Sequence, residues 1–453
     1  MPRECSNVGL VPSLAKGGLS NVWGAAVLPY LADELDEWPI RYEQLVPHYR
    51  AVLSLTSLSA VNDDLAARFP LFSDDYSPLV PSRQAAALLA DLACNRQALE
   101  ARGIRFGASR LAVRGRNNDG RPCAACGLCM YGCPYGLIYN SQDTLAELCR
   151  MPGFTYRGGV IVRRFSESGE TVRIFARSLA DGRPLQFEGT SLYVAAGVLS
   201  STRLLLDSLE AYDRTLTILD SQYFLLPMLR NRPVAGATDE AIHTLSQIFL
   251  ELFDDRLSAK SIHLQVYTYN ELYRQAIRAA LGPFDRPLSF AVRRFLERFL
   301  LIQGYLHSDI SGRIELKLRP PHGDEPSRLQ LVGKSNPVAR RVVKKIVGKL
   351  RSCRSLLKAF PLSPLLKIGE PGRGFHSGGT LPMRAKPGPL ETDPLGRPEG
   401  FRHVHIVDSS IFPSINANTV TLTVMANAHR IASLHGAGNA SRGGELHGAL
   451  SGS

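Results

Sequence analysis

The chain has 453 residues, of which 44% are hydrophobic and 21% are charged, and its formal net charge is +12. This composition is ordinary for a globular protein, and the length allows a large core divided between two domains or two lobes. Because the sequence has no nucleic-acid-binding signature, no signal peptide and no apolar run of about 18 residues, we expect a cytoplasmic protein with a solvated basic face, no nucleic-acid partner and no transmembrane segment.

The first distinctive segment is KGGLSNVWG, residues 16–24, which combines a glycine pair, small polar residues and a tryptophan. This pattern predicts backbone that lies directly against a flat ligand, because glycine has no Cβ to prevent the approach. No GxGxxG pattern follows a predicted strand anywhere in the sequence, so no phosphate-binding turn precedes this segment. The candidate ligand-lining residues are Gly17, Gly18, Ser20, Asn21 and Gly24.

A helix is predicted over 83–101, and four cysteines follow it in the segment CAACGLCMYGCP. Their spacing, C-x2-C-x2-C-x3-C-P, is that of bacterial ferredoxins, so one interpretation is that they bind a 4Fe-4S cluster. In two-cluster ferredoxins the fourth cysteine serves the other cluster, and no second run exists here. A zinc site, a disulfide and free thiols therefore stay open. The four candidate metal ligands are Cys123, Cys126, Cys129 and Cys133.

Segments 156–165, 171–178 and 185–197 are rich in β-branched and aromatic residues and are separated by turn residues, which predicts a short β-meander. The last of them runs through a glycine turn into a predicted helix that ends near residue 208. We expect Ser200 or Ser201 to be the N-cap of this helix.

The turn before that helix contains Ala196 and Gly197. Free N–H groups at such a helix start suit a phosphate or a ribose, so both residues are candidate cofactor contacts.

Residues 211–335 are predicted to form a separate lobe with an antiparallel sheet that has one open face. A helix is expected over 337–358, with Pro337 at its start, an apolar stripe toward the core and eight Lys and Arg residues in solvent. The lobe offers a substrate the following polar and aromatic side chains: His263, Gln265, Tyr267, Tyr305 and His307.

The strongest pattern lies in residues 375–432, which begin FHSGGTLPM and continue to HVHIVDSSIFPSINANTVTLT. His376 stands two residues before a Gly-Gly-Thr turn. A predicted strand then ends in Asp408, followed by Ser409 and a Pro-bounded loop. Asn418 and a threonine-rich run lead into a long helix.

Together with GGLSNVWG and LYVAAGVLSSTRLLLDS, this pattern resembles the glucose–methanol–choline (GMC) family of FAD-dependent oxidoreductases, in the same order over nearly the whole chain. The resemblance implies an α/β (α+β) fold: an incomplete Rossmann-type FAD domain and an antiparallel-sheet substrate domain. The implied parts are 1–210, the FAD domain without its N-terminal βαβ unit; 211–358, the substrate domain; 359–435, the FAD domain's C-terminal part with the catalytic motif; and 436–453, a disordered tail.

In this family a flavin takes a hydride from an alcohol carbon while a histidine removes the hydroxyl proton. The resemblance implies that His376 is this base, and that Asn418, or Thr419 when the chain is aligned on TLT, holds the second catalytic position. It also implies that Asp408, Ser409 and the amides that follow contact the flavin's phosphate–ribityl chain and pyrimidine ring. The residues implied to line the flavin ring are Gly17, Gly18, Ser20, Asn21 and Gly24. Val22 stands where some relatives attach FAD through a histidine, so we expect non-covalent FAD.

The resemblance therefore implies an FAD-dependent alcohol dehydrogenase or oxidase that acts on a polyol, sugar or sugar-containing molecule, with the electron acceptor left open. Family members begin with a GxGxxG βαβ unit of about 70–90 residues that this chain lacks. An upstream start or truncation, a second polypeptide or gene decay would each explain this, and the intact later motifs favour the first.

Two other functions stay open. One is a non-catalytic fragment or subunit that needs a separate nucleotide-binding unit. The other is an electron-transfer module built on an iron–sulfur cluster, although relatives contain a similar Cys-Gly-x-Cys loop without an obligatory cluster. With a cluster, we expect a dehydrogenase that passes single electrons onward.

Overall fold

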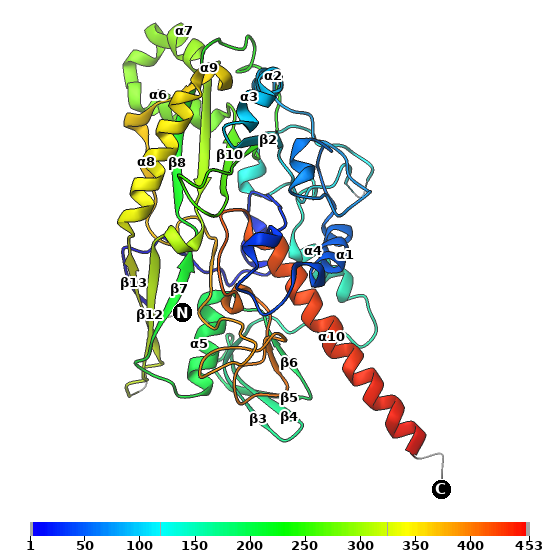
Figure 1. Ribbon diagram of the computed structural model, residues 1–453. Coiled ribbons are helices and arrows are strands. Elements are labelled where there is room, and N and C mark those ends of the chain that lie inside the picture. The colour runs from blue at the N-terminus through cyan, green and yellow to red at the C-terminus, as the bar shows by residue number, and fades with distance from the viewer. Residues whose placement is uncertain (1–2, 118, 324, 450–453) are drawn as a thin grey trace.

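The computed structural model describes residues 3–117, 119–323 and 325–449, with side chains described as far as residue 436. It is a mixed α/β fold with two large sheets and two small ones (Figure 1). The helices are α1 (Val46–Thr56), α2 (Arg83–Cys94), α3 (Arg96–Glu100), α4 (Ser141–Leu148), α5 (Val198–Ser208), α6 (Glu271–Leu281), α7 (Asp285–Leu296), α8 (Pro337–Ser352), α9 (Arg354–Leu357) and α10 (Val420–Ala449).

The largest sheet is antiparallel, with the order β14-β8-β11-β10-β9-β2 and with β15 paired to β8. Its middle strands come from the predicted lobe, whereas β2 comes from the region before the cysteines. Its strands are β2 (Ile104–Ala108), β8 (Tyr223–Arg230), β9 (Ile248–Leu252), β10 (Ile262–Tyr267), β11 (Phe299–Tyr305), β14 (Ala359–Pro361) and β15 (Lys367–Ile368).

One face of this sheet is apolar and packs against α2 and α8. Side chains alternate between the two faces of a strand, so Leu264, Ile302 and their neighbours point together into this core. Helix α8 begins at Pro337 after the N-cap Asn336. The predicted apolar stripe of α8 is buried from Val342 onward, which confirms that part of the prediction.

The opposite face of the sheet, which we call the polar face, carries Glu251, His263, Gln265, Tyr267 and Tyr305. This face is covered by other parts of the chain, whereas the prediction was an open face. Residues 25–31 pack beside it in the largest core cluster, together with Phe249 of β9. Buried Glu34 accepts hydrogen bonds from the Ser261 backbone and hydroxyl, at 3.2 and 2.6 Å. The prediction was wrong because it treated the lobe alone, and residues more than 200 positions earlier in the chain cover the face.

A five-stranded sheet has the order β1-β13-β12-β7-β16, in which β1 is parallel to β13 and the other pairs are antiparallel. The short strand β16 joins the C-terminal motif to β7 and so brings residues 375–380 to the edge of the lobe. The strands are β1 (Arg3–Ser6), β7 (Thr215–Asp220), β12 (Arg313–Arg319), β13 (Arg328–Lys334) and β16 (Ser377–Gly378).

The predicted meander is confirmed as a three-stranded antiparallel sheet of β3 (Val160–Ser168), β4 (Thr171–Ser178) and β5 (Pro184–Gly189). The next strand, β6 (Leu192–Val194), pairs in parallel with β17 (Val404–Ile406). Helix α5 then begins at Val198 with Gly197 as its N-cap, not Ser200 or Ser201. Gly197 adopts φ 80°, a left-handed conformation that suits glycine, and it turns the chain earlier than a serine cap would.

Within the described residues, no helix has the length and apolarity to cross a bilayer. Helix α10 projects away from the rest of the chain (Figure 1). The predicted tail, 436–453, lies largely outside the part whose side chains are described, so its disorder stays a prediction. The proposed domain boundaries also stay predictions.

Candidate active site

His376 lies directly before β16 and over the polar face. Its backbone carbonyl accepts a hydrogen bond from the Ser221 N–H at 3.0 Å. Its ring stacks on Tyr305 of β11, with 4.6 Å between the ring centroids and an angle of 23° between the planes. The C-terminal motif and the lobe therefore meet at this histidine.

The His376 imidazole is held in its neutral form. Its Nδ1 atom is buried and has no hydrogen-bond partner among the described residues. Burial lowers the pKa of His376 to about 3, and nearby His263 contributes in the same direction. A neutral imidazole can accept a proton, although this low pKa makes it a weaker base than a free histidine.

A second buried histidine extends the stack across the sheet. His263 of β10 lies behind Tyr305, with 6.1 Å between the ring centroids. Its Nδ1 is 2.5 Å from Glu251 Oε1, and both side chains are fully buried. Burial raises the pKa of Glu251, while His263 opposes that shift. Sequence reasoning missed Glu251, although a single carboxylate in the apolar run of β9 was a usable signal, because a buried charge needs a partner.

The same face continues as a chain of polar contacts. Gln265 Nε2 lies 3.1 Å from His263 Nε2, and Tyr267 donates its hydroxyl to Gln265 Oε1 at 2.9 Å. His307, just beyond β11, has a buried Nε2 without a partner in the described part of the chain. The five lobe residues expected to face a substrate are thus all buried on or beside the polar face.

Asp220 at the end of β7 fixes the loop that carries His376. Its carboxylate accepts hydrogen bonds from the Gly372 N–H and the Ser377 hydroxyl, each at 2.8 Å. Burial raises the pKa of Asp220 to about 7 despite these hydrogen bonds. Sequence reasoning also missed this residue, because nothing local to β7 indicates which loop it contacts.

The glycine stretch approaches the polar face at one end. A Cβ built on Gly24 would lie 3.7 Å from the Tyr267 hydroxyl, so this backbone borders the same group of side chains as His376. Gly18 has no neighbour within 4 Å of a built Cβ, which leaves room for a ligand there. Gly17 instead lies against Asn21 and the start of α4.

Ser20 and Asn21 hydrogen-bond to the start of α4 and also line a pocket of about 450 Å³. The Asn140 and Gln142 side chains both donate to Asn21 Oδ1, at 2.7 and 2.6 Å. Trp23 lines the same pocket, and so do two of the four clustered cysteines. The stretch thus presents both polar and aromatic groups to an open space.

Asp408 organises the turn at Gly197. Its Oδ2 accepts from the Gly197 N–H at 2.8 Å and from the Ser201 hydroxyl, and its Oδ1 accepts from the Ser410 N–H at 3.0 Å. These bonds occupy the carboxylate, so the structure places Asp408 behind the turn. Ala196 and Gly197 are exposed.

Ser409 connects this turn to the histidine loop. Its hydroxyl donates to the Ser377 carbonyl at 2.7 Å, and its carbonyl accepts from the Gly379 N–H at 2.9 Å. Hydrogen bonds of Ser409 therefore connect the segment beside the turn at Gly197 to the loop that carries His376.

Asn418 and Thr419 both hold the segment that follows the glycine stretch. Asn418 Nδ2 donates to the Pro29 carbonyl at 2.8 Å, and Thr419 Oγ1 accepts from the Leu28 N–H at 2.8 Å. Asn418 Oδ1 is buried and unpaired within the described residues. Asn418 therefore has a buried oxygen that no described group satisfies, whereas the Thr419 oxygen already has a partner.

The four clustered cysteines do not form a ligand set in this structure. Cys129 is buried, Cys123 and Cys133 are half-buried, and Cys126 is exposed. Burial raises the pKa of the Cys123 thiol, with smaller contributions from the other three sulfurs. No group of three or more His, Cys, Asp or Glu in the described ranges is arranged to hold a metal ion. The iron–sulfur interpretation therefore lacks structural support.

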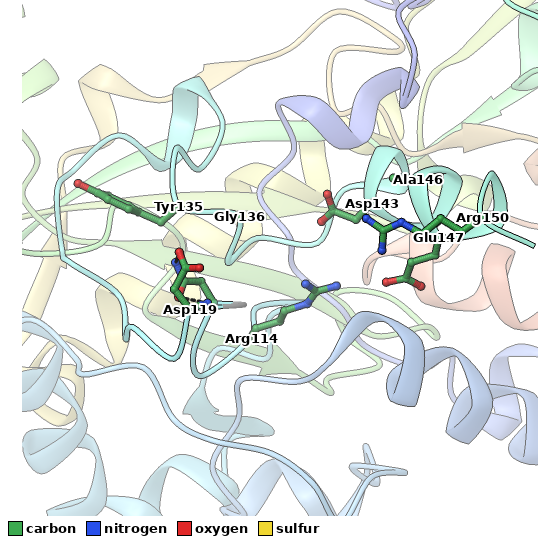
Figure 2. A pocket seen from close by; sticks show the side chains of 9 residues that line it. Arg114, Asp119, Tyr135, Gly136, Asp143, Ala146, Glu147 and Arg150 are labelled. Atoms are coloured by element: carbon green, nitrogen blue, oxygen red, sulfur yellow. Dashed lines mark hydrogen bonds between the residues drawn. The ribbon is translucent and has the colours of Figure 1, made fainter.

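A separate pocket of about 360 Å³ lies between α4 and the loop that carries Tyr135 (Figure 2). Arg114, Asp143, Glu147 and Arg150 are among the residues that line this pocket, and Asp143 and Glu147 belong to α4 (Figure 2). None of the predicted site residues lines this pocket. It adjoins the pocket at the glycine stretch, because Gly136 and Asp143 line both.

Comparisons with known proteins bear on the family and on the fold. Residues 369–428 match the family model described as GMC oxidoreductase. Pyridoxine 4-oxidase from Mesorbium loti has a TM-score of 0.57 at 14% identity, over 92% of this chain and 83% of that one. A comparison with curated protein sequences gives no significant match.

Two further solved structures are similar. An FAD-dependent oxidoreductase from Chaetomium thermophilum has a TM-score of 0.57 at 12% identity, over 94% of this chain and 86% of that one. A formate oxidase variant from Aspergillus oryzae has a TM-score of 0.56 at 15% identity, over 92% and 83%. The expected resemblance to the GMC family and the mixed α/β fold with antiparallel sheets are confirmed, whereas the roles of individual residues stay predictions.

Proposed function

We propose that this chain, whose residues 369–428 match the GMC oxidoreductase family, is an FAD-dependent oxidoreductase that acts on the CH–OH group of a small alcohol, with His376 as the base. The observation that carries the proposal is the position of His376. It stacks on Tyr305 over a buried polar face, its Nδ1 has no partner in the described residues, and the glycine stretch borders the same face.

The residues beside the glycine stretch fit a flat polar cofactor. The pocket of about 450 Å³ has the amide and hydroxyl groups of Ser20, Asn21 and Gln142 on its walls, with Trp23 as an aromatic surface. Gly18 leaves its side open, and Gly197 exposes a turn at the start of α5. FAD, when bound, supplies a two-electron acceptor for a hydride from the alcohol carbon. Val22 offers no attachment atom, which supports non-covalent binding.

The side chains around His376 support proton transfer from a hydroxyl group. The unpaired nitrogen of a neutral imidazole accepts that proton, and stacking on Tyr305 fixes the plane of the ring. To Asn418, whose Oδ1 is buried and has no partner among the described residues, we assign the role that the resemblance implies, orientation of the hydroxyl. Thr419 already uses its oxygen to hold Leu28, so we assign it a positioning role.

The polar face favours a substrate with several hydroxyl groups. His263, Gln265 and Tyr267 already pair with one another and with Glu251, so the groups left for a polar substrate are the buried nitrogens His307 Nε2 and His376 Nδ1, which have no partner among the described residues. Buried donors and acceptors discriminate strongly against ligands that leave them unpaired. A polyol or a sugar has a hydroxyl group for each of these two nitrogens, whereas a plain alkyl alcohol has only one.

Two measurements test the proposal. The purified chain is mixed with FAD and passed over a size-exclusion column, and the visible spectrum of the protein fraction is recorded. A panel of polyols, sugars and simple alcohols is then assayed with an artificial dye acceptor and, separately, by oxygen consumption. We expect bound flavin and dye reduction with a polyol or sugar, while the oxygen trace separates an oxidase from a dehydrogenase. Flavin binding without activity toward any alcohol would contradict the proposed reaction.

A second candidate is a subunit that binds FAD only together with a separate nucleotide-binding unit. The observation in its favour is the parallel sheet of β6 and β17, which has only two strands in the described part of the chain. A two-stranded sheet is marginally stable alone, so further strands from a separate unit would stabilise it. This candidate predicts no flavin in the protein fraction of the first measurement.

A further inference from the structure

The polypeptide makes a long excursion between two paired strands. Strands β10 and β11 are antiparallel neighbours, yet about 30 residues separate them in the chain. These residues form α6, a short turn at 282–284 and α7, which together we call the helical hairpin. Figure 1 shows the hairpin at one end of the molecule, beside α8 and α9 and opposite the meander of β3, β4 and β5.

The hairpin is held by its own small set of contacts. Tyr269, Val292 and Leu296 form an apolar cluster separate from the three larger cores. Arg274 bonds to both Asp285 oxygens, at 2.5 and 3.1 Å, and so clamps α6 to the start of α7. The excursion is therefore an ordered element with a fixed outer surface.

That outer surface exposes large apolar side chains. Phe290 is 75% exposed, Phe284 is 65% exposed and Leu288 is 43% exposed. Every residue from 286 to 291 is exposed. Exposed aromatic side chains grouped at one end of a molecule mark an interaction surface more often than scattered ones do.

The helical hairpin also has more basic than acidic residues. Residues 271–298 contain six arginines and three acidic residues. The acids are already engaged: Asp285 with Arg274, Glu297 with two arginines, and Glu271 with the Tyr269 hydroxyl.

The neighbouring helices add to this charge. Residues 337–358, which include α8 and α9, contain eight Lys and Arg residues and no acid. The apolar stripe of α8 is buried in the core, and its basic residues are exposed on the opposite side except Lys349, which pairs with Asp254.

We propose that this end of the molecule docks on an anionic phospholipid bilayer. Phe284 and Phe290 would enter the interface, while exposed cations of α8 such as Arg341 and Lys344 would contact lipid headgroups. The surface combines exposed aromatic groups with uncompensated positive charge on a projecting element. A projecting element fits a planar surface, and the aromatic groups have no counterpart in contacts to nucleic-acid phosphates. The proposal concerns a surface remote in the chain from His376, and it does not depend on the proposed reaction.

The test is co-sedimentation of the full chain with vesicles of phosphatidylcholine alone and of phosphatidylcholine mixed with phosphatidylglycerol. We expect binding to the mixed vesicles, weaker binding as salt increases, and little binding to the neutral vesicles. The double variant Phe284→Ser/Phe290→Ser should bind at least about tenfold more weakly, since it loses the inserted groups. Arg341→Glu/Lys344→Glu should also bind more weakly and lose most of the salt dependence.

Leu179→Ser is the matched control, because Leu179 is 65% exposed but follows β4 in the meander. It should bind like the unmodified chain. Circular dichroism melting of each variant checks that the exposed substitutions leave the fold intact. The proposal is overturned if mixed vesicles do not bind the chain, or if Leu179→Ser weakens binding as much as the hairpin variant does. Light scattering that shows a dimer lost in Phe284→Ser/Phe290→Ser, or a gel shift with duplex DNA in place of vesicle binding, would also overturn it.

Discussion

Replacement of Asp220 by asparagine tests whether a buried, mostly neutral carboxyl group anchors the loop that carries His376. Asp220 is 1% exposed, and burial raises its pKa from 3.8 to about 7. Each pKa unit corresponds to 1.36 kcal/mol, so this residue alone lowers the free energy of unfolding by about 4 kcal/mol between pH 4 and pH 7. The sign follows because the native state holds the proton in this range while the unfolded state has released it.

The Asp220→Asn variant mimics the protonated form. Its amide oxygen can accept from the Gly372 N–H, and its amide nitrogen can donate to the Ser377 hydroxyl, so both contacts survive. Urea unfolding of both proteins at half-unit steps from pH 5 to 8 gives the difference in the free energy of unfolding. We expect the variant to gain about 1.4 kcal/mol per pH unit up to pH 7 and then to reach a plateau. A difference that does not change with pH would refute the argument.

Three further predictions concern a closely packed glycine, a buried backbone N–H and the clustered cysteines. Gly378→Ala puts a Cβ against the Ser409 carbonyl and 2.9 Å from Ile415 Cδ1, so it should lower the free energy of unfolding in urea by about 1–3 kcal/mol. In the control Gly348→Ala in α8, the new Cβ has no neighbour within 4 Å, and the variant should be more stable by about 1 kcal/mol. Equal effects of the two substitutions would contradict the close packing at Gly378. Thr419→Val leaves the buried Leu28 N–H without its acceptor and should lower the unfolding free energy by about 1–3 kcal/mol, so an unchanged value would count against this contact. We expect the unmodified chain to contain no more iron than a blank in a colorimetric assay, and the same result for the variant Cys123→Ser/Cys126→Ser/Cys129→Ser/Cys133→Ser. Stoichiometric iron in the unmodified chain that is lost in the variant would restore the cluster interpretation.

The local motifs could be predicted from the sequence because their chemistry lies within a few residues. The apolar stripe of α8 and the alternation of the meander strands each depend on short periodic patterns, and the structure has both. The stretch 375–380 likewise contains a recognisable histidine and its glycine turn.

The contacts that hold the candidate site could not be predicted, because they join distant parts of the chain. Asp220 is 152 residues before Gly372, its hydrogen-bond partner. The Leu28 N–H meets Thr419 across 391 residues. A sequence pattern gives no information about such pairings. For the same reason it predicted an open face on the lobe, which residues 25–31 cover.

The prediction of the N-cap of α5 was wrong for a different reason. Serines are good N-caps, and the sequence offered two of them, but Asp408 already receives the Gly197 N–H and the Ser201 hydroxyl. That long-range carboxylate satisfies the start of the helix, so the local preference does not decide where the helix begins.

The central claim, that the imidazole at position 376 removes a proton from an alcohol, is tested most directly by rapid-mixing kinetics without oxygen. The loss of visible absorbance of bound FAD is followed after mixing with the best polyol or sugar, for the unmodified protein and for His376→Gln. We expect both proteins to hold flavin and the variant to reduce it about 10²–10⁴-fold more slowly. Equal reduction rates in two proteins that hold the same amount of flavin would contradict the claim.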